Sequence, residues 1–77
     1  MKLLVRNLPR SLSENELKAL FEAFGDIQSC DLVMDNVTGE SKGFGFVEMP
    51  KVGHVKAAIQ ALNGKEISGN KIRVKKA

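Results

Sequence analysis

The chain has 77 residues, a formal net charge of +3 and a pI of about 9.3. A chain of this length forms one domain, here residues 1–77, and buries only roughly 60 to 65% of its unfolded surface. No apolar run approaches the roughly 18 residues that a membrane span needs, and Met1–Arg6 is too short an apolar stretch for a signal peptide. We therefore expect a soluble, cytoplasmic monomer that has no membrane partner.

The positive charge is concentrated in the second half of the sequence. Residues 1–38 carry four basic and six acidic side chains, whereas residues 39–77 carry eight basic and three acidic ones. The second half is therefore where an anionic partner would be attracted.

The first part of the chain predicts a strand followed by an amphipathic helix. Lys2 to Arg6 alternates between core-facing apolar residues and other side chains, as a half-buried strand does. Ser13 followed by Glu16 is a capping-box signature, and apolar residues then recur at helical spacing until Gly25, which suits the position just beyond a helix. We expect this helix to have about three turns.

The middle of the chain predicts two more strands and a second helix. Residues 27–34 and 43–49 are expected to form antiparallel strands, joined by a polar loop over residues 35–41. Apolar residues at helical spacing between Pro50 and Asn63-Gly64 predict the second helix. A glycine and a β-branched valine weaken its first turn.

The order of the elements predicts the fold class. A turn over residues 66–69 leads to a last strand in which Ile72 and Val74 face the core. The resulting order, βαββαβ, is that of an α+β ferredoxin-like sandwich. Right-handed crossovers place both helices on one face of a four-stranded antiparallel sheet with strand order 4-1-3-2. The other face of the sheet is left uncovered.

Alternation along the strands determines which side chains lie on the uncovered face. Successive residues of a strand point to opposite sides, so Phe44 and Phe46 share this face. Pairing the second and third strands about their loop places Phe44 opposite Val33 and Phe46 opposite Asp31. Phenyl rings on an open sheet beside positive charge form a platform for unstacked nucleobases. The whole predicted set, which includes six basic and two acidic residues, is Lys2, Leu4, Arg6, Ser29, Asp31, Val33, Lys42, Phe44, Phe46, Glu48, Lys71, Arg73 and Lys75.

Two stretches of the sequence resemble the motifs of a known family. The octet Lys42–Met49 resembles the RNP1 motif of the RNA recognition motif family, Lys/Arg-Gly-Phe/Tyr-Gly/Ala-Phe-Val-x-Phe/Tyr, and departs from it only at Met49. Leu3–Leu8 is similar to the family's RNP2 motif, Leu/Ile/Val-Phe/Tyr-Leu/Ile/Val-x-Asn-Leu, with Leu4 where an aromatic residue is usual. The whole pattern is most similar to the short single-domain RNA-binding proteins of bacteria.

The resemblance implies that the chain binds short single-stranded RNA, of about two to four nucleotides, on the sheet and with low sequence selectivity. In that interpretation Phe46 stacks on one base and Phe44 contacts the base or sugar of a second nucleotide. Leu4 offers apolar contact without π overlap, which weakens binding. The choice of RNA over single-stranded DNA rests on the resemblance alone. The expected RNA-binding residues are Phe44, Phe46, Leu4, Lys42, Arg6, Lys2, Arg73, Lys75, Asp31 and Val33.

Some features leave alternatives open. Asp31 and Glu48 either accept hydrogen bonds from base amino groups or screen the basic residues around them. A peptide-binding module of the same fold is the main alternative function. An acylphosphatase-like hydrolase that uses Arg6 and Asn7 is more remote, because Leu8-Pro9-Arg10 occupies the place of the glycine-rich turn that such an enzyme needs.

No set of residues in the sequence predicts catalysis or metal binding. Cys30, the one cysteine, lies on the core side of its strand, is expected to be buried and inert, and can form no internal disulfide. His54 is expected at the surface. Because a single histidine here completes neither a Ser/His/Asp set nor a metal site, we expect no catalytic residue, metal, cofactor or small-molecule substrate.

Overall fold

Four strands and two helices build the architecture that the sequence predicts. The structure, a computed structural model, describes residues 1–77. The main sheet has the order β2-β3-β1-β6 with all neighbouring strands antiparallel, which confirms the ferredoxin-like α+β fold. Neither helix has the length and apolar character that crossing a bilayer requires. In chain order the elements are β1 (Lys2–Arg6), α1 (Glu14–Glu22), β2 (Ser29–Met34), β3 (Ser41–Glu48), α2 (Val52–Leu62), β4 (Glu66–Ile67), β5 (Asn70–Lys71) and β6 (Arg73–Lys76).

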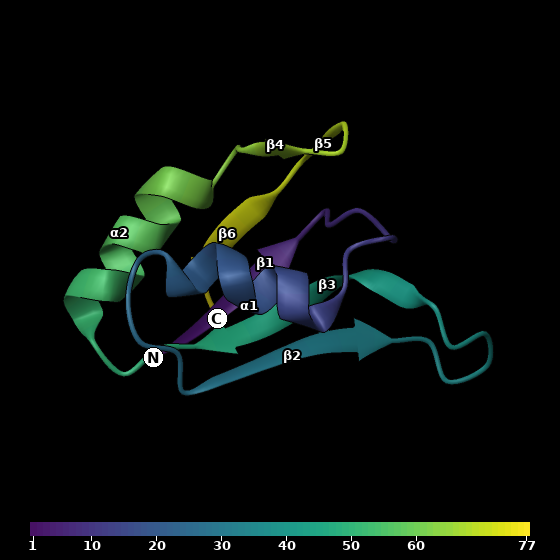
Figure 1. Cartoon of the computed structure of the whole chain (residues 1–77), viewed down its shortest axis with the longest axis horizontal. Coiled ribbons are helices and arrows are strands. Elements are labelled where there is room, and N and C mark those ends of the chain that lie inside the picture. Colours follow the sequence, from purple (N-terminus) through teal and green to yellow (C-terminus); the bar gives the residue numbers. More distant parts are fainter.

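Both helices pack on the same face of the main sheet. Figure 1 shows α1 in front of the strands and α2 beside β6. One buried cluster joins side chains of both helices to the inward-facing side chains of the strands. Each large apolar side chain in it contributes about 1.5 to 3 kcal/mol when fully buried. The members with no exposed surface are Leu3, Val5, Leu17, Phe21, Val47, Met49, Val55, Ala58 and Ile72.

The capping box predicted for the first helix is present. The Ser13 hydroxyl accepts a hydrogen bond from the Glu16 backbone N–H at 3.1 Å, and the Glu16 carboxylate accepts one from the Ser13 N–H at 3.1 Å. The helix ends at Glu22, so Gly25 lies beyond the position just after the helix that the sequence predicts for it. The reason is that the amides of Phe24 and Gly25 bond three residues back and tighten the last turn. α2 begins after Lys51 without a side-chain cap, in agreement with its weak first turn.

The turn predicted over residues 66–69 is instead a small two-stranded hairpin. β4 and β5 pair Glu66 with Lys71, and the two loop residues, Ser68 and Gly69, have positive φ values of 49° and 86°. Two left-handed residues in a two-residue loop are typical of a type I′ hairpin turn. Lys71 therefore belongs to β5 and not to the last strand, so it is removed from the set predicted on the uncovered face.

The register between β2 and β3 agrees with the prediction at one aromatic residue and differs at the other. Asp31 pairs with Phe46, as expected. The expected pair between Phe44 and Val33 is not formed, because the register shifts between the residues that flank Val33. Such an irregularity bends and twists a strand locally. β2 also begins at Ser29, later than predicted.

Gly45 lies where β3 closely approaches both β2 and α1. A Cβ atom built on Gly45 would lie 2.5 Å from the Asp31 carbonyl oxygen and 3.3 Å from a methyl group of Leu17 in α1. No side chain fits at that distance, so glycine allows β3 to pair with β2 directly beneath the helix. The residue between Phe44 and Phe46 is therefore determined by packing on the inner side of the sheet.

Gly45→Ala should lower the free energy of unfolding by about 1 to 3 kcal/mol, because the new methyl group must displace the β2 backbone or Leu17. Gly53→Ala is the matched control. A Cβ atom on Gly53 meets nothing within 4 Å, and alanine is about 0.5 to 1 kcal/mol more favourable than glycine inside a helix. Urea unfolding of both variants would measure the two changes, and a stabilised Gly45→Ala variant would contradict the close approach.

Candidate nucleic-acid interface

Phe44 and Phe46 project from β3 onto the face of the sheet that no helix covers. Both are half-buried, whereas Gly45 between them and Val47 after them are buried on the inner side. The two ring centroids lie 6.4 Å apart with their planes at 85°, a favourable edge-to-face arrangement. The alternation expected of this strand is therefore present.

Side chains from all four strands form a row across this face. Asp31 of β2, Phe46 of β3, Leu4 of β1 and Lys75 of β6 are consecutive partners in the ladders. Directly opposite residues on one face have Cβ atoms roughly 4.5 to 5.5 Å apart, so each contacts the next. The ring of Phe46 thus lies between a carboxylate on one side and a leucine on the other.

A lysine lies over the ring of Phe46. The Nζ atom of Lys2 is 5.1 Å from the ring centroid, which is within the range of a cation–π interaction. Lys2 pairs in the ladder with Glu48, whose carboxylate accepts a hydrogen bond from the Ser29 hydroxyl at 3.4 Å. At this end of the face, Lys2 therefore lies over the ring of Phe46, and the Glu48 carboxylate is hydrogen-bonded to Ser29.

Cations gather at the other end of the face, which we call the basic corner. Arg6 pairs with Arg73 across β1 and β6. Two cavities of about 660 and 310 Å³ share Arg6 and Asn7 in their walls, and no acidic side chain lines either one. The potential in both is therefore positive. The further cationic residues are Arg73 and Lys75 in the larger cavity and Arg10 and Lys42 in the smaller one, which also reaches Phe44.

Asn7 ties the basic corner to the β4–β5 hairpin. Its φ of 59° lies in the left-handed region, which asparagine adopts more readily than most residues. Its side-chain amide donates a hydrogen bond to the Lys71 carbonyl oxygen at 2.8 Å. The end of β1 and the hairpin are thus held together beside the cavities.

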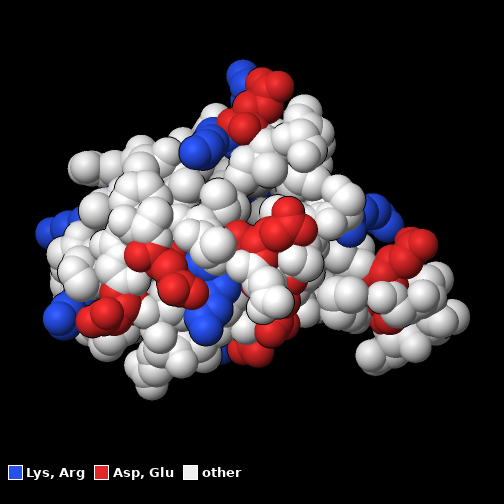
Figure 2. Space-filling model, viewed as in Figure 1, with Lys and Arg blue, Asp and Glu red and all other residues white.

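The surface around α1 carries the opposite charge. Figure 2 shows acidic side chains gathered over α1. Residues 14–26 contain four acidic side chains and one lysine. The uncovered sheet face, with its basic corner, and the surface around α1 therefore differ in sign.

The residues predicted to bind RNA lie together on the main sheet, with Val33 at the register shift. Their parts in binding stay predictions. The half-buried members are Leu4, Val33, Phe44 and Phe46, and the exposed members are Lys2, Arg6, Asp31, Lys42, Arg73 and Lys75.

The sequence profile of the RNA recognition motif family matches residues 3–73. The chain belongs to the RNA recognition motif family. This RNA recognition motif is similar to the RNA-binding protein CP29B, chloroplastic, of Arabidopsis thaliana, with 43% identity over 74 residues that cover 96% of this chain and 26% of that protein. The chain thus spans about a quarter of the length of the chloroplast relatives that it matches.

Two solved structures share the fold of this RNA recognition motif at substantial identity. The crystal structure of RNA binding protein PG1 has a TM-score of 0.95 and 38% identity, and the match covers 100% of this chain and 93% of that one. The Sxl-lethal protein/RNA complex has a TM-score of 0.94 and 36% identity, covering 99% of this chain and 46% of that one. Both support the family assignment.

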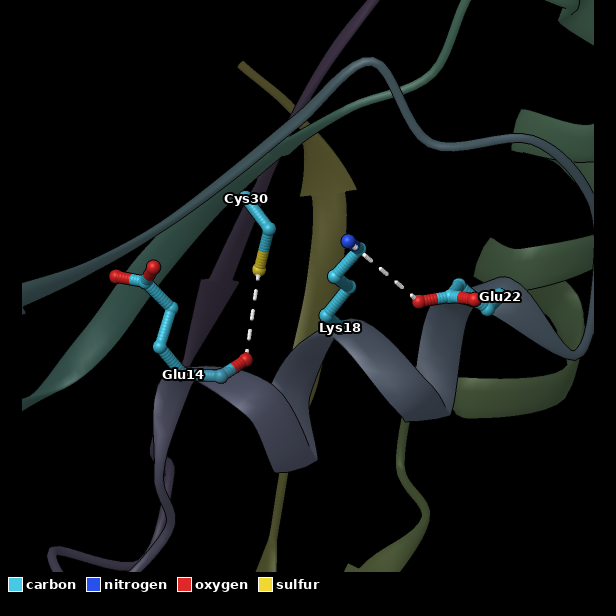
Figure 3. A network of polar contacts seen from close by, with 4 residues as sticks. All are labelled: Glu14, Lys18, Glu22 and Cys30. Carbon is cyan, nitrogen blue, oxygen red and sulfur yellow. Dashed lines mark hydrogen bonds and ion pairs between the residues drawn. The ribbon is translucent and has the colours of Figure 1, made fainter.

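Cys30 is half-buried, less enclosed than the sequence predicts. β2 is an edge strand, so α1 shields the thiol from one side only. Figure 3 shows its Sγ directed at the Glu14 carbonyl oxygen, to which it donates a weak hydrogen bond at 3.9 Å. Burial, reinforced by the negative charges of Glu14 and Asp31, raises the pKa of the Cys30 thiol to about 11.

His54 is half-buried, although the sequence predicts it at the surface. Its ring packs against Gly25 so closely that a Cβ atom there would overlap the imidazole. The Nδ1 atom of His54 is buried without a hydrogen-bond partner. No group of three or more His, Cys, Asp or Glu side chains lies close enough together to hold a metal ion.

Cys30 should react slowly with thiol reagents while the protein is folded. With a pKa of about 11 in place of 9.0, the thiolate is about 100-fold rarer near neutral pH, and alkylation by iodoacetamide should slow by that factor relative to the unfolded chain. Mass spectrometry of quenched samples would measure both rates. Glu14→Gln removes a negative charge beside the thiol and should speed the reaction, whereas equal rates in folded and unfolded protein would contradict the shift.

Proposed function

We propose that this chain binds short single-stranded RNA on the uncovered face of its sheet and performs no catalysis. The observation that carries the proposal is the pair of phenyl rings, Phe44 and Phe46, displayed among cations on a surface that no helix covers. Membership of the RNA recognition motif family supports it. The similarity to RNA binding protein PG1 and to the protein of the Sxl-lethal protein/RNA complex also supports it.

Each ring has a separate part in this function. A base stacks on Phe46 and takes the place of the Lys2 ammonium that lies over the ring in the free protein. The released ammonium is then available to a phosphate. A second nucleotide contacts Phe44, beside the smaller cavity of the basic corner. Leu4 continues the row with apolar contact and no π face.

The basic corner holds the backbone of the bound strand. Arg6, Arg73 and Lys75 surround one cavity without a carboxylate among them, so phosphate groups are attracted there. Contacts of this kind position the strand and carry no sequence information. With about two bases stacked and a few phosphates held, we expect a Kd of about 1 µM or weaker, near −8 kcal/mol, and low overall selectivity.

Several finer features remain predictions. Residues 1–77 act as one domain and as a cytoplasmic monomer, and the ligand is RNA in preference to single-stranded DNA. The relatives described above include a plant chloroplast protein and lend no support to the predicted resemblance to bacterial proteins. Peptide binding on the same fold is the alternative function, and no observation favours it.

Phe44→Ala and Phe46→Ala should each weaken RNA binding about 5- to 150-fold, because stacking contributes about 1 to 3 kcal/mol per base. The chain has no tryptophan or tyrosine, so anisotropy of a fluorescently labelled oligonucleotide is the suitable measurement. Val52→Ala removes an exposed apolar side chain from the helical side and should leave affinity unchanged. Full affinity in both phenylalanine variants would exclude the sheet face as the RNA site.

Leu4→Phe should tighten RNA binding by about 5-fold or more, because it places a third ring in the row beside Phe46. Val52→Phe adds a ring on the helical side and is the matched control, for which we expect no gain. Thermal melting of both variants would show that the fold is retained. A folded Leu4→Phe variant with wild-type affinity would contradict the proposed path of the strand across β1.

A further inference from the structure

Asp31 is an exposed carboxylate on a face that otherwise attracts anions. Neither of the ion pairs in the structure includes it: they join Lys18 to Glu22 and Lys51 to Asp26. Its neighbour in the ladder is a phenyl ring, Phe46. An unpaired carboxylate at this place repels the phosphates of a bound strand, so by itself it lowers affinity.

Glu48, the other carboxylate on the same face, is in a different situation. It accepts a hydrogen bond from the Ser29 hydroxyl, and it pairs in the ladder with Lys2. Its charge is thus partly compensated within the protein. Asp31 is the carboxylate whose oxygens are both open to a ligand.

The position of Asp31 is that of a group which reads the edge of a stacked base. A base that lies on the ring of Phe46 extends beyond it toward the neighbouring strands, and the next side chains in the row are Asp31 on one side and Leu4 on the other. Leucine has no donor or acceptor. Of the two side chains next to Phe46 in this row, only Asp31 can therefore make a polar contact with the base edge.

An ionised carboxylate can only accept hydrogen bonds, and this restricts the bases that it can bind well. Guanine presents two neighbouring donors, N1–H and the N2 amino group, which match the two oxygens of a carboxylate. Adenine and cytosine present one amino group beside a ring-nitrogen acceptor, and uracil presents one N–H between two carbonyl oxygens. Two parallel charge-assisted hydrogen bonds are stronger and more specific than one.

We propose that Asp31 selects guanine as the base stacked on Phe46. The inference rests on the proposed function and adds a preference at one position of the bound strand, so the overall selectivity stays low. The carboxylate compensates for its repulsion of phosphate only when a guanine engages both of its oxygens.

The test compares labelled RNA octamers that differ only in the base at one central position. The three probes are an all-uridine strand, the same strand with one central guanosine, and the same strand with inosine there, which lacks the N2 amino group. The wild-type chain should bind the guanosine strand about 10-fold more tightly than the inosine strand. The uridine strand should bind no better than the inosine strand.

Variants then assign the preference to the carboxylate. Asp31→Asn should reduce the guanosine-to-inosine ratio to less than about 2-fold and should strengthen binding of the all-uridine strand, because one negative charge is lost. Asp31→Ala should give the same loss of ratio. Glu48→Gln removes the same charge from the same face and should keep the ratio. Asp31 is exposed, so these variants are expected to fold, which circular dichroism would verify.

The possible outcomes distinguish failure of the guanine preference from failure of the proposed RNA binding. Equal wild-type affinity for the three probes, or an undiminished ratio in Asp31→Asn and Asp31→Ala, would overturn the guanine preference while RNA binding stands. Loss of the ratio in Glu48→Gln as well would also overturn it, because charge in general would then be the cause. Absence of binding to every probe would instead overturn the proposed function.

Discussion

The packing of β3 against the helices is the constraint on which the rest of the molecule depends. Val47 and Met49 must be buried, and Gly45 must let the backbone of β2 and a leucine of α1 approach within contact distance. Since successive side chains of a strand point to opposite faces, satisfying the inner face leaves Phe44 and Phe46 outside. The binding platform is in this sense a by-product of core packing, and its position cannot shift without disturbing the core.

Features governed by local chemistry could be predicted from the sequence. The bounds of β1 and the capping box at Ser13 follow from residue types within short windows. The strand order follows from the order of the elements, and the pairing of Asp31 with Phe46 follows from the position of the loop that joins the two strands. The β4–β5 hairpin was not predicted, because it is short and depends on a left-handed Ser68, a conformation with no strong residue signal. The register shift around Val33 has no such signal either, because regular alternation along both strands predicts an unbroken register.

The members of the site that sequence reasoning missed come from distant parts of the chain. Arg10 lies in a turn and Asn63 follows α2, and the two cavities join them to β1 and β6. Spacing along the sequence does not reveal such neighbours, because three-dimensional contacts between elements bring them together. The half-burial of Cys30 and His54 has the same origin, since it depends on how closely α1 and the Gly25 turn cover them.

Glu14 shows how the acidic side of the molecule also protects the sheet. Its carboxylate accepts a hydrogen bond from the Leu32 backbone N–H at 3.3 Å, on the open edge of β2. Unpaired backbone groups on an edge strand are sites where other chains can pair, and a carboxylate placed over them blocks that route. The charge of α1 therefore contributes to the integrity of the fold, apart from any part in recognition.

The ammonium of Lys2 above Phe46 has a consequence for how copies of the protein behave toward one another. Exposed aromatic side chains on a sheet surface favour association between molecules in concentrated solution. Here the ammonium of Lys2 lies over the ring of Phe46. If two copies met face to face, the cations around the ring would repel the same cations of the other copy. Repulsion between like charges therefore disfavours face-to-face association of two copies, and a bound polyanion would neutralise that repulsion.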